Sequence, residues 1–261
     1  MSTNALGEWS EVSARVRRMY DDYGWSEDGG VTHDADACED LRAVAAPYVS
    51  ACRLRVNRAL TGGDRILDFG SGPIQYPEYL TYSENYAKRV CVDLSARGLE
   101  GARAKLGDRG EYHCGNILEL DLPLEGHDAV VSLHVLYHNH KDIQATIVRR
   151  LLSLVKPGKP VVIVYSNPAY LPAATAGRIR RWLRPPGDDQ IYFYRHPLSW
   201  WRQFEDAAEV AITPWRSLTT RDQKLFVKTE SMFERLWAFE EKHPQLAVKL
   251  ANYPMIVLTK R

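Results

Sequence analysis

The stretch ILDFGSGPIQYPEYL, residues 66–80, decides how the rest of the sequence is interpreted. Its apolar start is typical of a buried strand, and the small residues Gly70, Ser71 and Gly72 let a ligand approach the backbone closely. Pro73 suits the first turn of a helix, where its missing N–H leaves no hydrogen bond unmade. The stretch therefore predicts a strand, a glycine turn that faces a ligand, and a helix that begins with Pro73.

Two familiar nucleotide-binding signatures are excluded by the same turn. The G-x-G-x-x-G dinucleotide pattern requires a third glycine where this chain has Gln75. The P-loop requires a lysine directly after its last glycine, and this turn supplies none. We therefore expect a different nucleoside-like ligand.

The segments around the turn alternate between strand and helix patterns. Amphipathic helices are expected over residues 8–23 and 38–61, separated by a loop rich in Gly and Asp. Further on, the expected strands are 65–70, 89–95, 111–117, 128–136 and 160–166, with helices from residue 73 and over 95–107 and 142–155. This rhythm predicts βαβ units and a parallel sheet.

The rhythm changes after residue 166. Residues 167–195 are too many for an ordinary connection and predict an inserted cap. A helix over 197–206, a strand over 209–218, a helical region over 233–250 and a buried strand over 253–261 are expected to follow. We divide the chain into an N-terminal helical lid, residues 1–60, and a main domain, residues 61–261, that contains the cap.

Composition narrows the possible function classes. The 261 residues carry 34 Lys and Arg against 33 Asp and Glu, and a formal charge of +1 offers no basic field for nucleic acid. The N-terminus lacks the apolar core of a signal peptide, and no run of 18 apolar residues occurs, so we expect a cytoplasmic protein without stable membrane insertion. The scattered cysteines predict neither a disulfide framework nor a structural zinc site: Cys38, Cys52, Cys91 and Cys114.

Polar residues follow three successive expected strands. Asp68 lies near the end of the first strand, Asp93 ends the second, and Gly115-Asn116-Ile117 follows the third. A carboxylate at the position of Asp93 is suited to ribose hydroxyls, and an amide beside an apolar residue is suited to a purine. Each carboxylate alone has a simpler reading, Asp68 as a turn cap and Asp93 as the N-cap of the helix after it.

At this point the sequence resembles the class I S-adenosylmethionine-dependent methyltransferases, in particular their type 11 small-molecule branch. The resemblance rests on LDFGSG (67–72), VCVDLS (90–95), GNILELDLP (115–123), DAVVSLHVLYH (128–138) and LLSLVKPGKPVVIVYS (151–166), in the family's order. It implies a doubly wound, mostly parallel α/β sheet of seven strands with the last one antiparallel, S-adenosylmethionine as cofactor and S-adenosylhomocysteine as product.

The resemblance also implies roles for residues. Asp68, Gly70, Ser71 and Gly72 would surround the methionine part of the cofactor, and His134 would line the same end. The remaining expected cofactor contacts are Asp93 with Leu94 at the ribose, Asn116 and Ile117 at adenine, and Tyr20 from the N-terminal helix. The third glycine common in the family turn is Ile74 here, and the aromatic tail after it is unusual, which places the contacts beyond Gly72 in doubt.

A histidine cluster, His134 to His140, is the densest candidate for chemistry. His138, with Tyr137 beside it, resembles the family's histidine after the fourth strand, and it is either a base, an acceptor-orienting group or a residue that shapes the pocket. A metal held by His134, His138 and His140 is a weaker alternative because only Asp142 is a nearby carboxylate, so no metal is expected.

The acceptor pocket is expected to draw on the N-terminal segment and the cap. His33 follows Tyr20, Tyr23 and Trp25, aromatic residues that suit either a sulfonium cation or a packed core. The other expected acceptor contacts are Tyr165, Tyr192, Tyr194 and His196. An arginine cluster in the cap would bind an anionic acceptor, a phosphate or the membrane surface, or would simply be a solvated helix face: Arg178, Arg180, Arg181 and Arg184.

Together these features predict methyl transfer to an oxygen or nitrogen of a small organic metabolite. Oxygen is slightly favoured because the histidines suggest a need for proton removal. The alternatives are a protein of this fold that binds the cofactor for other chemistry, or a non-catalytic cofactor-binding subunit. The sequence leaves the acceptor and the oligomeric state open.

Overall fold

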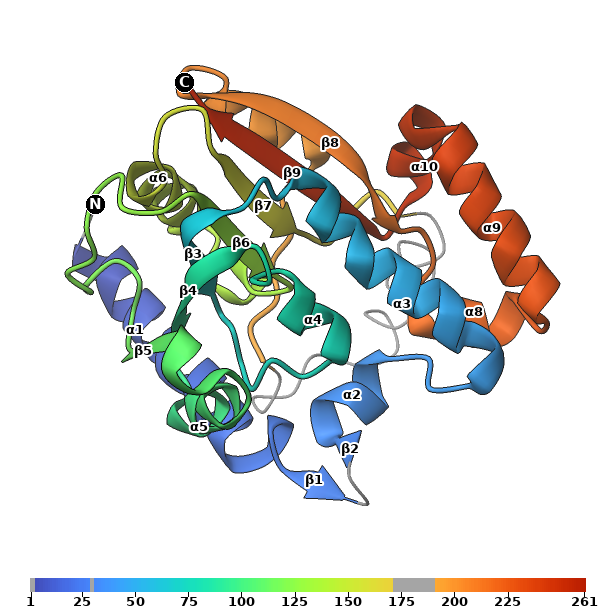
Figure 1. Cartoon of the computed structure of the whole chain (residues 1–261), viewed down its shortest axis with the longest axis horizontal. Coiled ribbons are helices and arrows are strands. Elements are labelled where there is room, and N and C mark those ends of the chain that lie inside the picture. The colour runs from blue at the N-terminus through green and yellow to red at the C-terminus, as the bar shows by residue number, and fades with distance from the viewer. Residues whose placement is uncertain (1–2, 29–30, 171–190) are drawn as a thin grey trace.

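A mixed sheet forms the centre of the computed structural model, which describes residues 3–28, 31–170 and 191–261 (Figure 1). The strand order is β5-β4-β3-β6-β7-β9-β8. The strands are β3 (Gly63–Phe69), β4 (Tyr86–Asp93), β5 (Gly110–Cys114), β6 (Ala129–Leu133), β7 (Pro160–Val164), β8 (Ala208–Arg216) and β9 (Tyr253–Lys260). The prediction of a doubly wound, seven-stranded sheet is thereby confirmed.

Strand direction also follows the prediction. β3 pairs in parallel with β4 and β6, and β6 pairs in parallel with β7. β9 runs antiparallel to both β7 and β8. The chain order reverses beside β3, between its neighbours β4 and β6, and this switch point is where open parallel sheets bind ligands.

Helices cover both faces of the sheet (Figure 1). Leu67, Val90 and Val130 pack in one core cluster with α6 and the 3-10 segment Leu198–Phe204. Ile66 and Val131 pack in a second cluster with Val56, on the side of α3 and α4. The helices are α1 (Thr3–Met19), α2 (His33–Cys38), α3 (Ala46–Leu54), α4 (Pro77–Thr81), α5 (Ala96–Leu106), α6 (Gln144–Leu154), α8 (Thr220–Phe226), α9 (Glu230–Lys242) and α10 (Pro244–Leu250).

The helix expected to begin at Pro73 does not form there. The chain turns at Pro73, and α4 begins only at Pro77, because Ile74 has a φ of 51°. A right-handed helix cannot pass through a residue in this left-handed region. Ile74 instead buries its side chain beside Cys91 and Leu99. The tail of the glycine turn is thereby left as an extended connection.

The expected helix over residues 38–61 is also divided. It comprises a 3-10 turn at Ala43–Ala45, α3 and a second 3-10 turn at Arg55–Ala59. α3 has Pro47 in its first turn, the part of a helix where proline is favoured. The expected helical region 233–250 breaks in the same way at Pro244, which opens α10.

The N-terminal segment contains more structure than the sequence indicated. A π-helical turn, Tyr20–Gly24, continues α1, and a two-stranded sheet of β1 (Glu27–Asp28) and β2 (Val31–Thr32) leads to α2. α3 contacts α4, β8 and α9 and is thus packed on the main body. The α3 part of the predicted lid thus belongs to the packed body, and a lid remains a prediction for the region before α3.

The cap expected at about 167–195 falls largely outside the described residues. This applies to the arginine cluster Arg178, Arg180, Arg181 and Arg184. In the described part of the chain, no helix combines the length and the apolar character needed to cross a bilayer.

Candidate functional site

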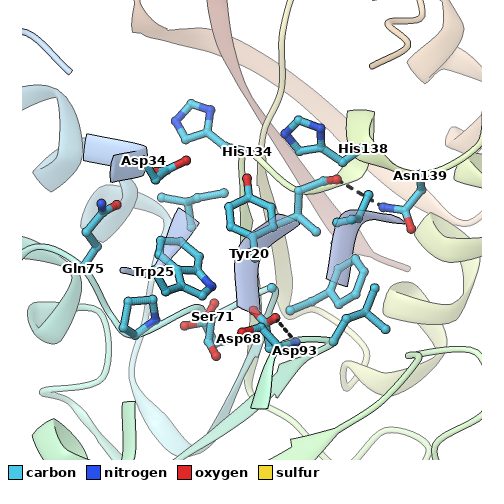
Figure 2. Close-up of a pocket in the computed structure, with 18 of the residues that line it drawn as sticks. Tyr20, Trp25, Asp34, Asp68, Ser71, Gln75, Asp93, His134, His138 and Asn139 are labelled. Atoms are coloured by element: carbon cyan, nitrogen blue, oxygen red, sulfur yellow. Dashed lines mark hydrogen bonds between the residues drawn. The ribbon is translucent and has the colours of Figure 1, made fainter. Parts of the chain in front are cut away.

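A cavity of about 260 Å³ opens at the carboxyl edge of the sheet, beside the switch point (Figure 2). We call its two parts the strand-edge end and the far end. The strand-edge end is lined by residues that follow β3, β4 and β5, namely Asp68, Gly70, Ser71, Asp93, Leu94, Asn116 and Ile117. The far end is lined by Asp34, Gln75, Tyr76, His134, Tyr137, His138, Arg216 and Tyr253.

The glycine turn is held in a shape that only glycine adopts easily. Gly70 has a φ of 75°, and an added Cβ would lie 2.2 Å from a methyl carbon of Val135. Gly72 has a φ of 50°, and its added Cβ would lie 2.7 Å from the Trp25 ring. Gly70 N–H donates to the carbonyl of Val92 over 2.7 Å, which ties the turn to β4. Gly72 itself is not among the residues that line the cavity.

Asp93 ends β4 and organises the turn from the other side. Its Oδ2 accepts a hydrogen bond of 2.8 Å from Gly72 N–H, and its Oδ1 accepts one of 2.8 Å from Ser95 N–H. Burial raises the pKa of this carboxyl to about 6, although both hydrogen bonds favour the ionised form. Ser95, rather than Asp93, is the N-cap of α5, because its side chain accepts from Gly98 N–H.

Asp68 is paired rather than free. Its Oδ2 accepts from Nε of Arg89 at 3.0 Å and from Nη2 at 2.5 Å, and both residues are buried. Both also line the strand-edge end. An ion pair in this place offers one positive and one negative group to a zwitterionic ligand.

Asn116 and Ile117 follow β5. The Asn116 side chain accepts from Leu118 N–H at 3.0 Å and donates to Glu119 at 2.8 Å, which holds the loop in a tight turn. Ile117 is buried and joins the core beside Leu122. The loop thus places an apolar side chain and the backbone of Gly115 and Asn116 at the cavity wall.

The N-terminal segment covers the cavity. Tyr20 and Trp25 stack with ring centroids 4.8 Å apart, and Figure 2 shows them between the strand-edge carboxylates and the histidines. Ser95 donates to Asp21 over 2.6 Å, which attaches the π-helical turn to the start of α5. The aromatic pair therefore lines the cavity wall and is not only packed in the core.

His134 and Tyr137 form one buried pair. Nδ1 of His134 lies 3.1 Å from the Tyr137 hydroxyl, and the His134 ring meets the rings of Trp215 and Tyr253 edge to face. Burial, with Arg216 nearby, lowers the pKa of His134 well below its ordinary value. His134 is therefore a neutral ring at physiological pH. Its φ of 64° turns the chain away from β6 and into the cavity rim.

His138 has a defined tautomer. Its Nδ1 lies 3.0 Å from the Tyr192 carbonyl, and because a carbonyl only accepts, Nδ1 carries the proton and Nε2 carries the lone pair. Burial lowers the pKa of His138 to about 4. The ring is thus a permanent hydrogen-bond acceptor at neutral pH but a weak base.

The described lining does not include five residues that we expected at the acceptor. His33 stacks edge to face with Tyr23. Tyr165 is buried in the core and donates to Gln144 over 2.6 Å. Tyr192 supports the loop before α6 by accepting from Lys141 N–H, whereas His196 packs flat on Trp200 beside Tyr194. The backbone of Tyr192 and Tyr194 supports the segment that presents His138, because it hydrogen-bonds His138 and Tyr137.

Several charged or polar lining residues were missed by sequence reasoning, among them Asp34, Gln75, Arg89 and Arg216. Asp34 was assigned to a loop, although Thr32 before it is the N-cap of α2 and accepts from Ala35 N–H. A threonine followed by acidic residues is a helix-start signal that was available. Gln75 lies in the unusual tail, while Arg89 and Arg216 lie within strands, where nothing in the local pattern marks a charged residue as functional.

The metal alternative finds no support in the described residues, where no group of three His, Cys, Asp or Glu side chains is arranged to hold an ion. His140 turns toward Asp142, with Nδ1 3.7 Å from its carboxylate. The three histidines of the cluster therefore do not converge.

Comparisons with known proteins agree with this geometry. Residues 67–163 match the family model described as a methyltransferase domain. No curated protein matches the chain. This family uses S-adenosylmethionine as its cofactor.

Solved structures with the same fold span the chain. A magnesium protoporphyrin IX methyltransferase from Synechocystis PCC 6803 with bound SAH is 16% identical, covers 100% of both chains and has a TM-score of 0.57. A geranyl diphosphate C-methyltransferase from Streptomyces coelicolor A3(2) is 14% identical over 96% of this chain and 98% of that chain, with a TM-score of 0.59. An S-adenosylmethionine-dependent methyltransferase from Mesorhizobium loti is 18% identical over 84% and 98%, with a TM-score of 0.54. At these identities the likeness establishes the fold.

Proposed function

We propose that the chain is a class I S-adenosylmethionine-dependent methyltransferase that transfers a methyl group from this cofactor to an oxygen or nitrogen of a small organic molecule. One observation carries the proposal. A single cavity is lined at one end by the strand-edge residues and at the other by His138 and Asp34. Cofactor and acceptor would therefore meet in the same cavity.

The strand-edge end fits the cofactor chemically. Each Asp93 oxygen accepts one backbone N–H and keeps a further lone pair for a ribose hydroxyl. The Asp68–Arg89 pair matches an amino-acid zwitterion, and the missing Cβ at Gly70 leaves its backbone open. Trp25 Nε1 is a buried donor without a partner among the described residues, and its side chain lines the same cavity.

When bound, S-adenosylmethionine supplies a methyl group activated by its positive sulfur. The protein's task is then to align the acceptor and exclude water. Tyr20 and Trp25 cover the cavity, and their ring faces suit a nearby positive charge. His138 Nε2 can accept a hydrogen bond from the acceptor and so direct its nucleophilic atom. A pKa of about 4 makes His138 an orienting group rather than an efficient general base.

Two measurements test the proposal. Calorimetric titration with S-adenosylmethionine and S-adenosylhomocysteine should show binding of both, and no binding at millimolar concentration would contradict the cofactor claim. Incubation of metabolite panels with a methyl-labelled donor should transfer the label to at least one small molecule. Binding without transfer to any acceptor would instead support a non-catalytic cofactor-binding protein.

A further inference from the structure

The far end of the cavity carries a carboxylate, Asp34, that no cation of the described residues pairs with. Asp34 lies in the first turn of α2, and Figure 2 shows its side chain at the cavity on the same side of Tyr20 as His134. Among residues 3–28, 31–170 and 191–261, no ion pair involves it. Burial, and after it the negative charge of Glu39, raises the pKa of Asp34 to about 6, whereas the hydrogen bond with the neutral Gln75 side chain lowers it.

The two arginines that bind Glu39 are already matched. Arg216 is 2% exposed, and its Nη1 lies 2.7 Å from Glu39. Arg53 lies 3.6 Å from Glu39 and 3.3 Å from Glu78. Two guanidinium groups are thus balanced by two carboxylates. The negative charge of Asp34 remains without a positive partner in this part of the chain.

Several aromatic rings line the same cavity as the carboxylate. Its charge raises the pKa of Tyr20, Tyr76, Tyr79 and Tyr137, in each case after burial or other larger causes, which places all four rings within electrostatic reach. Ring faces attract cations and give anions nothing comparable. A wall of phenol rings with one carboxylate is a favourable environment for a positively charged head group.

The position of Asp34 is fixed by local structure. Thr32 caps α2 by accepting from Ala35 N–H over 3.2 Å, and Thr32 also accepts a hydrogen bond from the Gln75 amide. The tail of the glycine turn is therefore bonded to the helix that presents the carboxylate. Asp34 consequently has a defined place relative to the turn that leads into the strand-edge end.

We infer that the methyl acceptor is an amine whose positively charged nitrogen binds Asp34 at the far end of the cavity. This inference rests on the proposed function and narrows its oxygen-or-nitrogen choice to nitrogen. An amine suits the other groups as well: once a proton passes from the ammonium group to the Asp34 carboxylate, the nitrogen lone pair forms a bond to the methyl carbon while the bond from that carbon to sulfur breaks, and S-adenosylhomocysteine leaves.

An anionic acceptor is the main competitor. Of the described residues that line the far end, Arg216 is the cation it would bind, and the Nε of Arg216 has no partner among the described residues. The same arginine already binds Glu39, however, and an anion there would lie near two carboxylates. The charge distribution therefore favours a cation.

Three probes that share one ring and differ only in head group separate these possibilities. 2-Phenylethylamine, 2-phenylethanol and 3-phenylpropionate are titrated into the full chain with and without S-adenosylhomocysteine. We expect the amine to bind about tenfold more tightly than the alcohol, which corresponds to about 1.4 kcal/mol. Asp34→Asn should remove this preference while leaving the affinity for S-adenosylhomocysteine within about threefold.

Asp36→Asn is the matched control, because Asp36 lies on the same helix, is exposed and does not line the cavity. It should keep the preference of the unmodified protein, and Asp34→Glu should keep part of it. Equal binding of amine and alcohol, binding of none of the probes, a preference for the carboxylate probe, or an unchanged preference in Asp34→Asn would each overturn the inference. Failure of S-adenosylhomocysteine to bind counts against the proposed function instead, and the head-group ranking measured without it still decides the role of Asp34.

Discussion

The two ends of the cavity are built in different ways. The strand-edge end uses residues that follow directly after β3, β4 and β5, and much of its shape is backbone: a glycine turn held by Asp93 and by Val92. The far end gathers side chains from α2, the turn tail, the loop after β6, and the ends of β8 and β9. One end depends on local sequence and the other on how distant segments pack.

This difference separates the part of the cavity that the backbone fold determines from the part that side chains determine. A methyltransferase fold is shared with structures named for a porphyrin and for geranyl diphosphate, at 16% and 14% identity. An end made of strand termini and backbone changes little when side chains change. An end assembled from side chains can be altered without disturbing the sheet, so acceptor choice belongs there.

The largest effect should come from breaking the backbone of the strand-edge end. Gly70→Ala places a Cβ against Val135 at a φ of 75°, and we expect a loss of about 3 kcal/mol of stability from strain and overpacking, together with loss of S-adenosylhomocysteine binding. Gly158→Ala is the control, since its φ is 72° but nothing lies within 4 Å of the added carbon. It should cost only about 1 kcal/mol in chemical denaturation. Equal losses in the two variants would argue against a crowded turn.

Asp93→Asn should weaken S-adenosylhomocysteine binding by about 10- to 100-fold, as expected for a charged hydrogen-bond acceptor. The pKa of Asp93 is about 6, so affinity in the unmodified protein should fall as pH drops below 6, and the variant should lack this slope. The stability of the fold depends on pH in the opposite direction. A pKa raised from 3.8 gives stability that is fully present below about pH 4 and is lost as pH rises through 6. Calorimetry and denaturation across this range measure both, and an unchanged binding slope in Asp93→Asn would contradict the assignment.

His138→Ala tests the role of the far end in acceptor turnover. We expect kcat/KM for the acceptor to fall about tenfold, the loss of one hydrogen bond, with cofactor affinity unchanged. Because the pKa of His138 is about 4, its titration should not shape the rate between pH 6 and 8. Steady-state kinetics on any acceptor found in the screen provide the test. A loss of several hundredfold, or a bell-shaped profile that the variant abolishes, would restore the general-base role.

Trp25→Ala should have a smaller effect at the boundary between the two ends. Removal of the ring that lies on Gly72 and stacks on Tyr20 should weaken S-adenosylhomocysteine binding about fivefold, because the cavity loses part of its cover. Tyr23→Ala in the same segment is the control, since Tyr23 is 58% exposed. Titration of both variants should show the loss only for Trp25.

His33→Ala should produce the smallest effect. The ring packs on Tyr23 and does not line the cavity, so binding and turnover should change less than about twofold. A larger drop in acceptor kinetics would show that the original expectation for His33 was right and that the segment moves when the acceptor binds.

The same contrast explains which features the sequence could predict. The cavity positions of Asp68, Asp93, Asn116 and His138 follow from motifs at or directly after strand ends, whereas the antiparallel last strand follows from the family resemblance. The helix expected at Pro73 was wrong because a buried Ile74 in a left-handed conformation outweighs the local preference of proline.

The far end was not predictable in the same way. Asp34 and Arg216 are 182 residues apart in number and share the cavity only through tertiary packing. Tyr165 and His196 have suitable side chains in suitable segments, but the Tyr165 ring packs on Trp201 and the His196 ring packs on Trp200. Residue type and order cannot reveal which side of a loop faces a cavity.

The most direct test of the account is a crystal structure of the protein with S-adenosylhomocysteine bound. We predict the ribose hydroxyls at Asp93, the amino-acid group at Asp68 and Arg89, and the sulfur directed toward Tyr20 and the far end. Density for the ligand elsewhere, or with the sulfur turned away from the side of Asp34 and His138, would contradict the division of this cavity into cofactor and acceptor ends.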